Sequence, residues 1–271
     1  MIPLRDNIPP RTFPFVNYLM IASCAIAFIT QLADQTDGQD HLVESLGMIP
    51  ARVLHPDRPI QITEEVVVPT QFGYQREVRE RTFAEPPFSP WLTLLTCVFL
   101  HGSWMHFLGN MWFLHIFGDN VEDRFGHVGY LIFYLASGVA SSAAHLASAP
   151  GSTMPTIGAS GAIAGVMGAY LLLYPHAKVL TILPIFIFIQ VIVVPAPLFL
   201  GFWFLLQFFE GTFAITASKT GGVAWWAHIG GFASGFVVAW LLEKAGRVSP
   251  PVETVLPNTN RMSHYRYRRL D

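Results

Sequence analysis

Long apolar runs, rather than amphipathic stripes, dominate the hydropathy pattern of this chain. A helix needs roughly 20 apolar residues to cross a hydrocarbon core of about 30 Å, so such runs are typical of membrane spans. The apolar segments fall at 13–32, about 100–118, 128–147, 158–174, 179–213 and 222–242. The pattern predicts an all-α integral membrane protein, built as a bundle of six transmembrane helices.

Two of these segments have unusual lengths. The helix that begins at Ser160 covers only about 21 Å at the helical rise, so it is too short to span the core. The segment 179–213 would cover about 52 Å, which is too long for one span. Because the sequence VVPAP interrupts it, we expect 179–194 to be an interfacial or re-entrant stretch and the span to begin near Ala196.

The distribution of basic residues sets the orientation. Lys and Arg favour the cytoplasmic ends of spans, whereas long loops cross largely regardless of their charge. Six spans leave these basic residues in the cytoplasm: Arg5, Arg11, Arg124, Lys178, Lys244, Arg247, Arg261, Arg266, Arg268 and Arg269. We predict a cytoplasmic tail at 1–12, a membrane domain at 13–244 and a basic cytoplasmic tail at 245–271. The N-terminus lacks a cleavable signal pattern, and we expect a multi-pass protein of the plasma (inner) membrane.

The first loop, at 34–90, is the only sizeable soluble piece, and the topology makes it extracytoplasmic. Its stretch 60–83 alternates in part between apolar and polar residues, which predicts a β-hairpin. The loop has too few apolar residues for a core of its own, so we expect it to pack on the membrane domain.

The composition agrees with a membrane protein, and the net charge bears on which classes of partner are expected. Of 271 residues, 52% are hydrophobic and 13% are charged, and soluble domains usually carry about twice that charge fraction. The net charge of -2 gives no reason to expect a nucleic-acid partner. Cys24 and Cys97 lie in apolar segments without a metal-binding pattern, so we predict two buried thiols.

Three polar side chains are predicted to lie at the same depth in the membrane. Polar groups within spans are costly and are therefore candidates for function. Ser160, His228 and His106 each lie about 20–22 Å from the cytoplasmic end of their helix, and Asn110 is one turn from His106. Small residues four apart, at Gly161 and in the His228 helix, favour close packing of the helices that carry Ser160 and His228.

This set fits nucleophilic acyl transfer. Ser160 would attack a carbonyl, and His228 would take its proton and pass it to the leaving group. The free amides at the start of the Ser160 helix, with His106 and Asn110, would stabilise the oxyanion. The sequence GASGA differs from the GxSxG elbow of soluble hydrolases, since Ala162 replaces the last glycine.

The whole constellation resembles the rhomboid family of intramembrane serine proteases, over residues 95–245. The resemblance is carried by HGSWMHFLGN, with His101, His106 and Asn110, by GDNVEDRFG at 118–126, by GASGA around Ser160 and by AHIGG around His228. It implies a six-helix rhomboid-like bundle with a Ser160–His228 dyad. It also implies cleavage of the transmembrane segments of other proteins in the lipid bilayer, near their extracytoplasmic end, without a metal or organic cofactor.

The resemblance also assigns roles to other residues. His106, Asn110 and the amides of Ser160 and Gly161 would bind the oxyanion, and Gly158 would keep the backbone close to the substrate carbonyl. The Phe-rich fifth segment would line a lateral entry, capped by the loop at 211–222. Two positions depart from the family pattern. Ala164 stands where many members have a Tyr that stacks on the histidine, and Trp225 or Trp226 could take the place of that Tyr. Leu92 follows Trp91 at a position where an Arg is common.

Other interpretations stay open at this point. Glu210 could act as the acid of a triad, although a boundary or gate role is favoured, and His101 could contact substrate at the entrance. A metallohydrolase on His101, His106 and His115 lacks the HExxH pattern. An inactive rhomboid-like protein that binds membrane proteins is the alternative from another class, and a small-solute transporter is disfavoured because no inverted repeat is found. The Glu122–Arg124 pair is interpreted as a structural clamp.

Overall fold

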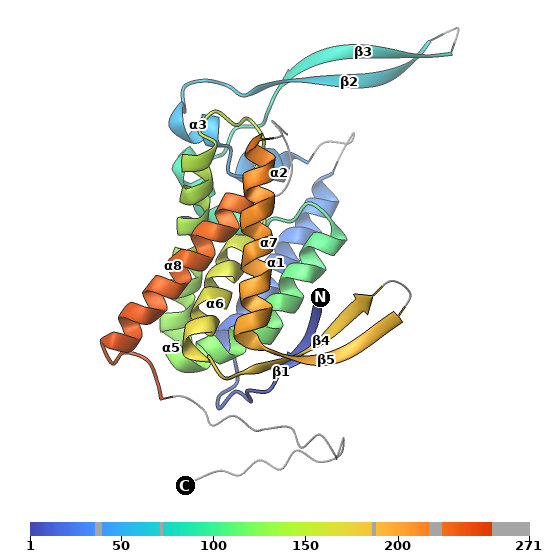
Figure 1. Ribbon diagram of the computed structural model, residues 1–271. Coiled ribbons are helices and arrows are strands. Elements are labelled where there is room, and N and C mark those ends of the chain that lie inside the picture. The colour runs from blue at the N-terminus through green and yellow to red at the C-terminus, as the bar shows by residue number, and fades with distance from the viewer. Residues whose placement is uncertain (36–39, 71–72, 186–187, 217–223, 251–271) are drawn as a thin grey trace.

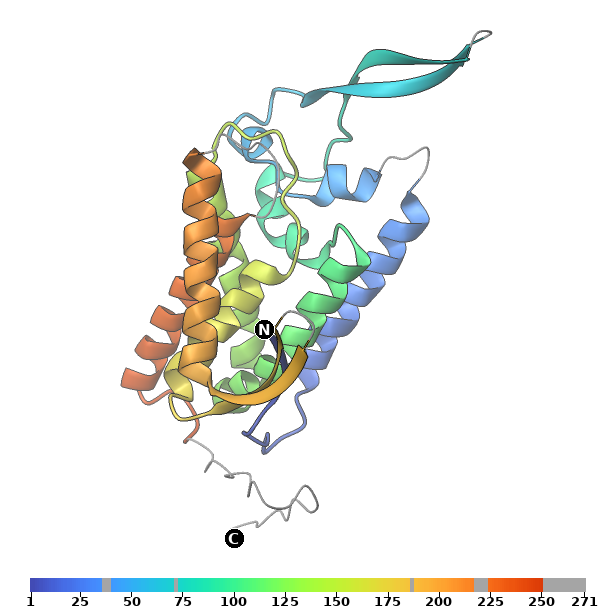
Figure 2. The same cartoon turned by 45° about the vertical axis from the view of Figure 1, so that its right-hand side comes forward.

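The computed structural model describes residues 1–35, 40–70, 73–185, 188–216 and 224–250. Most of this part is helical and forms one bundle (Figures 1 and 2). Its main helices are α1 (Phe15–Asp34), α5 (Trp104–Ser148), α6 (Ser160–Leu173), α7 (Ala196–Thr216) and α8 (Trp225–Lys244). The short helices between α1 and α5 are α2 (His41–Leu46), α3 (Pro50–Leu54) and α4 (Thr93–Thr96), with 3-10 turns at Pro90–Leu92 and Cys97–Phe99.

The main helices account for the predicted apolar segments. In the described part of the chain, α1, α5 and α8 are long and apolar enough to cross a membrane, while α6 and the 196–209 part of α7 are shorter apolar helices. Helix α5 has 45 residues but bends at Gly126, where a φ of 71° interrupts the helix. Its two arms match the separate segments predicted at about 100–118 and 128–147. The chain is thus a mostly helical integral membrane protein.

The prediction of an all-α fold was too narrow. The stretch expected to be interfacial or re-entrant forms two strands, β4 (Lys178–Ile185) and β5 (Phe188–Pro195), and α7 begins directly after them at Ala196, as expected. Strand β1 (Ile2–Asp6), from the predicted N-terminal tail, pairs with β4, so the sheet order is β1-β4-β5. The cause is the high content of Val, Ile and Phe in this stretch, since these residues favour extended strands over short interfacial helices.

The predicted hairpin in the first loop is confirmed. Strands β2 (Gln61–Thr70) and β3 (Gly73–Thr82) pair antiparallel from Gln61↔Thr82 to Thr70↔Gly73. The hairpin extends away from the bundle (Figure 1). The loop segment before it docks on the loop between α5 and α6, through two backbone hydrogen bonds between Met48 and Thr156. The expectation that the first loop packs on the membrane domain therefore holds for the base of the loop and not for the hairpin.

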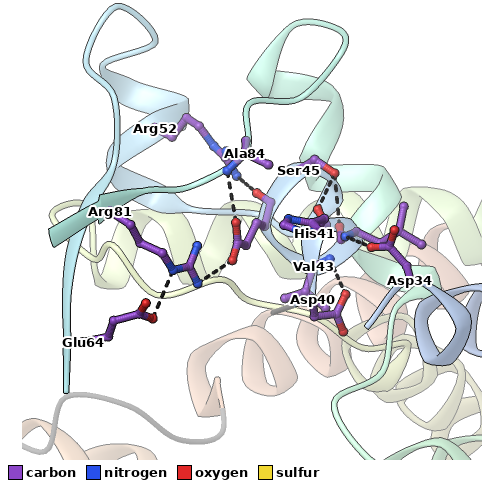
Figure 3. A network of polar contacts seen from close by, with 11 residues as sticks. Asp34, Asp40, His41, Val43, Ser45, Arg52, Glu64, Arg81 and Ala84 are labelled. Atoms are coloured by element: carbon purple, nitrogen blue, oxygen red, sulfur yellow. Dashed lines mark hydrogen bonds and ion pairs between the residues drawn. The ribbon is translucent and has the colours of Figure 1, made fainter. Parts of the chain in front are cut away.

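A polar network holds the base of this hairpin (Figure 3). The Glu44 carboxylate forms an ion pair with Arg81 at 2.7 Å and accepts a hydrogen bond from the amide of Ala84 at 3.1 Å. Arg81 also reaches Glu64 at 3.1 Å, and the Arg52 guanidinium donates to the carbonyl of Ala84 at 2.8 Å. Burial raises the pKa of Glu44, but the hydrogen bonds from Arg81 and Ala84 together outweigh it and leave this pKa below its ordinary value.

Glu122 and Arg124, interpreted from the sequence as a structural clamp, each bond to groups on other helices. The Glu122 carboxylate accepts the backbone N–H groups of Val16 and Asn17, at 2.9 and 2.7 Å, and so caps the start of α1. Arg124 instead donates to the carbonyl of Leu173 at 3.2 Å and lies 3.5 Å from the carboxylate of Glu243. The two side chains thus tie the bend of α5 to three other helices.

Helix α6 packs against α8 through their backbones. A Cβ at Gly231 would overlap the carbonyl oxygen of Gly161, and a Cβ at Gly235 would overlap that of Gly165. A Cβ at Gly161 would in turn overlap Ser141 of α5. The predicted small-residue packing is therefore present, and α6 is buried between α5 and α8.

Replacing Gly235 with Ala should lower the melting temperature of the detergent-solubilised protein by several degrees. The new methyl group meets the Gly165 backbone, and such overpacking costs about 1–3 kcal/mol. Gly201→Ala in α7 is the matched control, because no heavy atom lies within 4 Å of its Cβ position. Equal melting temperatures for Gly235→Ala and wild type, measured by differential scanning fluorimetry, would contradict this account of the packing.

Replacing Glu44 with Gln should loosen the base of the hairpin by about 1–3 kcal/mol, because Arg81 loses a buried charged partner. A carboxyl whose pKa is lowered by folding stabilises the fold above its unfolded pKa, and this stability is lost as the pH falls through the folded value. Hydrogen exchange of the amides at 61–82 should therefore speed up both in Glu44→Gln and in acid. Glu77→Gln is the control, because the ion pair of Glu77 with Arg79 is solvent-exposed, and its amides should exchange as in wild type. Equal loss of protection in Glu44→Gln and Glu77→Gln would contradict the role of Glu44.

Candidate active site

Two polar side chains from separate helices meet inside the bundle. Ser160 is the first residue of α6, and His228 lies in the first turn of α8. The Ser160 Oγ and the His228 Nε2 are 2.7 Å apart, which is a short hydrogen bond. The glycine contacts between α6 and α8 bring the two backbones close enough for these short side chains to touch.

The serine is recessed within the bundle. Figure 2 shows α6, drawn in yellow, beginning well below the upper end of α7. Helix α6 has 14 residues, whereas α8 has 20, so the predicted short helix is present. Its short length leaves room above Ser160 for a depression in the molecule.

The second ring nitrogen of His228 has a partner that the sequence analysis missed. The His228 Nδ1 lies 2.5 Å from the Oε1 of Gln207, on α7. Gln207 is buried and is the only residue with an amide, hydroxyl or charged side chain between Ala196 and Phe209. The rule that polar residues within spans are functional candidates would have identified it. Glu210, the acid considered from the sequence, lies outside the described side chains.

Two tryptophans surround the imidazole. The Trp203 ring is 5.9 Å from the His228 ring at an interplanar angle of 39°, and the Trp225 ring is 6.1 Å away and nearly perpendicular at 85°. Trp225 was one of the aromatic residues expected to take the place of the Tyr that is missing at Ala164. The contact that is closer to stacking comes from Trp203, on the neighbouring helix α7.

Hydrogen-bond donors gather near the serine. The His106 Nδ1 accepts the amide N–H of Gly102 at 3.4 Å, so the proton of a neutral ring lies on Nε2. The Asn110 Nδ2 is buried and has no hydrogen-bond partner in the described part of the chain. No side chain of the described residues caps the first turn of α6, which leaves its N–H groups available.

Gly158 supports this arrangement through its backbone. Its φ of +126° is a conformation that other residues rarely adopt, and a Cβ there would lie 2.7 Å from the His106 ring. The Gly158 amide donates to the carbonyl of Cys97 at 2.9 Å, which fixes the loop in front of α6. Gly158 thus allows the His106 ring to lie against the backbone two residues before Ser160.

A cavity of about 1510 Å³ joins these groups. Its lining includes Ser160, His228, Gln207, His106 and Asn110, and the loop at 148–158 forms much of its wall. The volume exceeds that of usual small-molecule sites, about 300–1,000 Å³, and is large enough for an extended polypeptide segment. The predicted capping loop at 211–222 lies largely outside the described residues, as does the tail from 251.

The other predicted histidines lie elsewhere. The His101 ring, predicted to contact substrate at the entrance, is buried against Phe28, Phe107 and His106 and is not among the residues that line the cavity. The His115 ring contacts Tyr18 on an exposed surface. His101, His106 and His115 do not form a cluster, and in the described part of the chain no three His, Cys, Asp or Glu side chains group as metal ligands.

Comparison with known proteins places this site in a family. The family model described as a rhomboid domain matches residues 89–245. "Rhomboid-like protein 11, chloroplastic" of Arabidopsis thaliana is 28% identical over 58% of this chain and 54% of its own length. "Rhomboid protein 1, mitochondrial" of Saccharomyces cerevisiae is 29% identical over 57% of this chain and 42% of its own length. "Rhomboid protease GluP" of Bacillus subtilis is 32% identical over 58% of this chain and 27% of its own length.

The matched part of the chain spans from about a quarter to about half of the length of these relatives. The family model matches residues 89–245, which are more than half of this chain and include every residue that lines the cavity around Ser160. The chain therefore belongs to the rhomboid family.

Proposed function

We propose that this protein is an intramembrane serine endopeptidase that cleaves transmembrane segments of other membrane proteins near their extracytoplasmic face. The observation that carries the proposal is the 2.7 Å hydrogen bond between the Ser160 Oγ, at the uncapped N-terminus of α6, and the His228 Nε2. The relative GluP of Bacillus subtilis is named a rhomboid protease. The large cavity next to Ser160 also fits a polypeptide better than a small molecule.

Each residue of the site has its own role in the proposed reaction. The Ser160 Oγ attacks the substrate carbonyl carbon while the His228 Nε2 takes the hydroxyl proton. The carbonyl oxygen becomes an oxyanion, which the amides of Ser160 and Gly161, the His106 Nε2–H and the Asn110 side chain stabilise. His228 then gives its proton to the leaving amine, and an acyl-enzyme forms. A water molecule, activated by His228, releases the acid product and restores Ser160.

The arrangement in the membrane is part of this proposal. We infer six crossings, made by α1, the two arms of α5, α6, α7 and α8, with both termini in the cytoplasm of a plasma (inner) membrane. The distribution of basic residues and the position of the long first loop support this orientation. Because freed backbone groups are costly in lipid, substrates with helix-weakening Gly or Pro near the cleavage site are expected.

A rhomboid-like binding protein without protease activity is the competing function. The replacement of the family Tyr by Ala164 favours it, because that ring stacks on the histidine in many members. The retained Ser160–His228 hydrogen bond and the Trp203 ring beside the imidazole argue against it. The two functions differ in whether Ser160 is a reactive nucleophile.

Ser160→Ala and His228→Ala should each lower the cleavage of a model transmembrane substrate by at least about 10³-fold, because the nucleophile or its base is lost. Purified protein in liposomes is compared by gel, and labelling with a fluorophosphonate probe measures the reactivity of Ser160 directly. Ser234→Ala is the matched control, since this serine of α8 bonds only to the Gly231 carbonyl among the described residues. Wild type that neither cleaves nor labels better than Ser160→Ala would favour the binding protein.

Gly158→Ala should reduce cleavage by about 10²-fold or more. The substitution strains the backbone at φ +126° and pushes the His106 ring away from the oxyanion position. Gly151→Ala is the control, because Gly151 also lines the cavity and has no heavy atom within 4 Å of its Cβ position. Cleavage rates of Gly158→Ala equal to those of Gly151→Ala would contradict the role given to Gly158 and His106.

A further inference from the structure

We propose that Gln207 is a positioning residue that completes an uncharged Ser160–His228–Gln207 triad. The Gln207 Oε1 lies 2.5 Å from the His228 Nδ1, and the His228 Nε2 lies 2.7 Å from the Ser160 Oγ. Three helices, α6, α7 and α8, thus supply one side chain each to a continuous chain of hydrogen bonds. The kinetic part of this inference rests on the proposed function, whereas the orientation of the ring does not.

The chemistry of the amide determines the proton positions. The oxygen of a glutamine side chain accepts hydrogen bonds and donates none, so the His228 Nδ1 must carry the proton in this contact. A neutral imidazole then has its lone pair on Nε2, directed at the Ser160 hydroxyl. The amide therefore selects the one neutral tautomer in which His228 can act as the base.

The environment of α7 explains why an amide suits this position. Leu205, Phe208 and Phe209 are exposed on the surface of α7, in the apolar segment that contains Gln207. An ionised carboxylate in such a segment is expensive to bury, whereas an amide with a hydrogen-bond partner is much less so. Gln207 can thus orient the ring without placing a second charge in an apolar helix.

The ring is held on its flat sides as well. Trp203 is one turn before Gln207 on α7, and its ring lies beside that of His228 at 5.9 Å. Trp225 approaches the same ring from α8. The tryptophans restrict the tilt of the imidazole, and Gln207 fixes which nitrogen faces Ser160. A single helix, α7, therefore carries both the stacking contact and the acceptor.

The test compares Gln207→Leu, Gln207→Glu and wild type by kcat, KM and pH profile on a model transmembrane substrate in detergent micelles. Gln207→Leu removes the acceptor and should lower kcat by about 10²–10³-fold while KM changes little, because the wrong tautomer becomes populated. Gln207→Glu keeps an acceptor and should recover much of the rate. Leu241→Ala, at an exposed position of α8 outside the fifth segment, is the matched control and should behave as wild type.

The pH profile separates positioning from mere packing. A carboxylate at 207 stabilises the imidazolium, so the acid limb of kcat/KM in Gln207→Glu should move to higher pH by about one unit or more. His106 and His145, both on α5, are the other histidines that line the cavity with His228, and all variants retain them. A Gln207→Leu variant that keeps the wild-type kcat, or a Gln207→Glu variant with an unmoved limb, would overturn the inference.

A spectroscopic measurement keeps the test independent of protease activity. In protein labelled with ¹⁵N-histidine, the His228 signals are identified by their loss in His228→Ala. The wild-type ring should show the Nδ1–H tautomer, and Gln207→Leu should lose this preference even if folding is only partly retained. A tautomer that is the same in wild type and Gln207→Leu would overturn the inference. Wild type that shows the expected tautomer but neither cleaves nor labels would instead refute the proposed function alone.

Discussion

Direct backbone contact between α6 and α8 is the constraint on which the site depends. Serine and histidine side chains are short, so their hydrogen bond requires two helix axes closer than side chains usually permit. Glycines at Gly168, Gly231 and Gly235 lack the atoms that would keep these two helices apart. In lipid, where apolar side chains gain little by leaving the surrounding hydrocarbon, such van der Waals contact is a main source of helix association. The same residues therefore stabilise the bundle and set the geometry of the site.

Several polar side chains inside the bundle are matched by a group from a distant segment of the chain. Gln207 of α7 meets His228 of α8, and Glu122 of α5 accepts the first backbone N–H groups of α1. Gln31 of α1 exchanges two hydrogen bonds with the backbone of His101, at 2.9 and 3.2 Å. Because an unpaired polar group is costly in this medium, these pairs restrict how the helices can be placed relative to one another.

The sequence predicted the features that depend on local pattern. The apolar segments, the start of α7 at Ala196 and the hairpin at 60–83 follow from hydropathy, from proline positions and from alternation. The approach of Ser160 to His228 followed from counting residues along helices, because rise per residue is nearly constant.

The remaining features depend on contacts between distant residues. Strand β1 pairs Ile2 with Ile182, and no local pattern in either stretch specifies the other. Gln207 lies 21 residues before its partner, on another helix, so only the packing of α7 on α8 reveals the pair. The partners of Glu122 and Arg124 also lie far away in the sequence, so no local pattern specified them.

The projecting hairpin has a consequence for how the protein behaves at high density in a membrane. A two-stranded ribbon exposes backbone groups along both of its outer sides, and these could join ribbons of neighbouring molecules into larger sheets. Strand β3 carries Arg76, Glu77, Arg79, Glu80 and Arg81 in near succession. Charged side chains on an exposed strand hold water that pairing with a second ribbon would have to remove, which disfavours such sheets while the ribbon reaches into the aqueous phase.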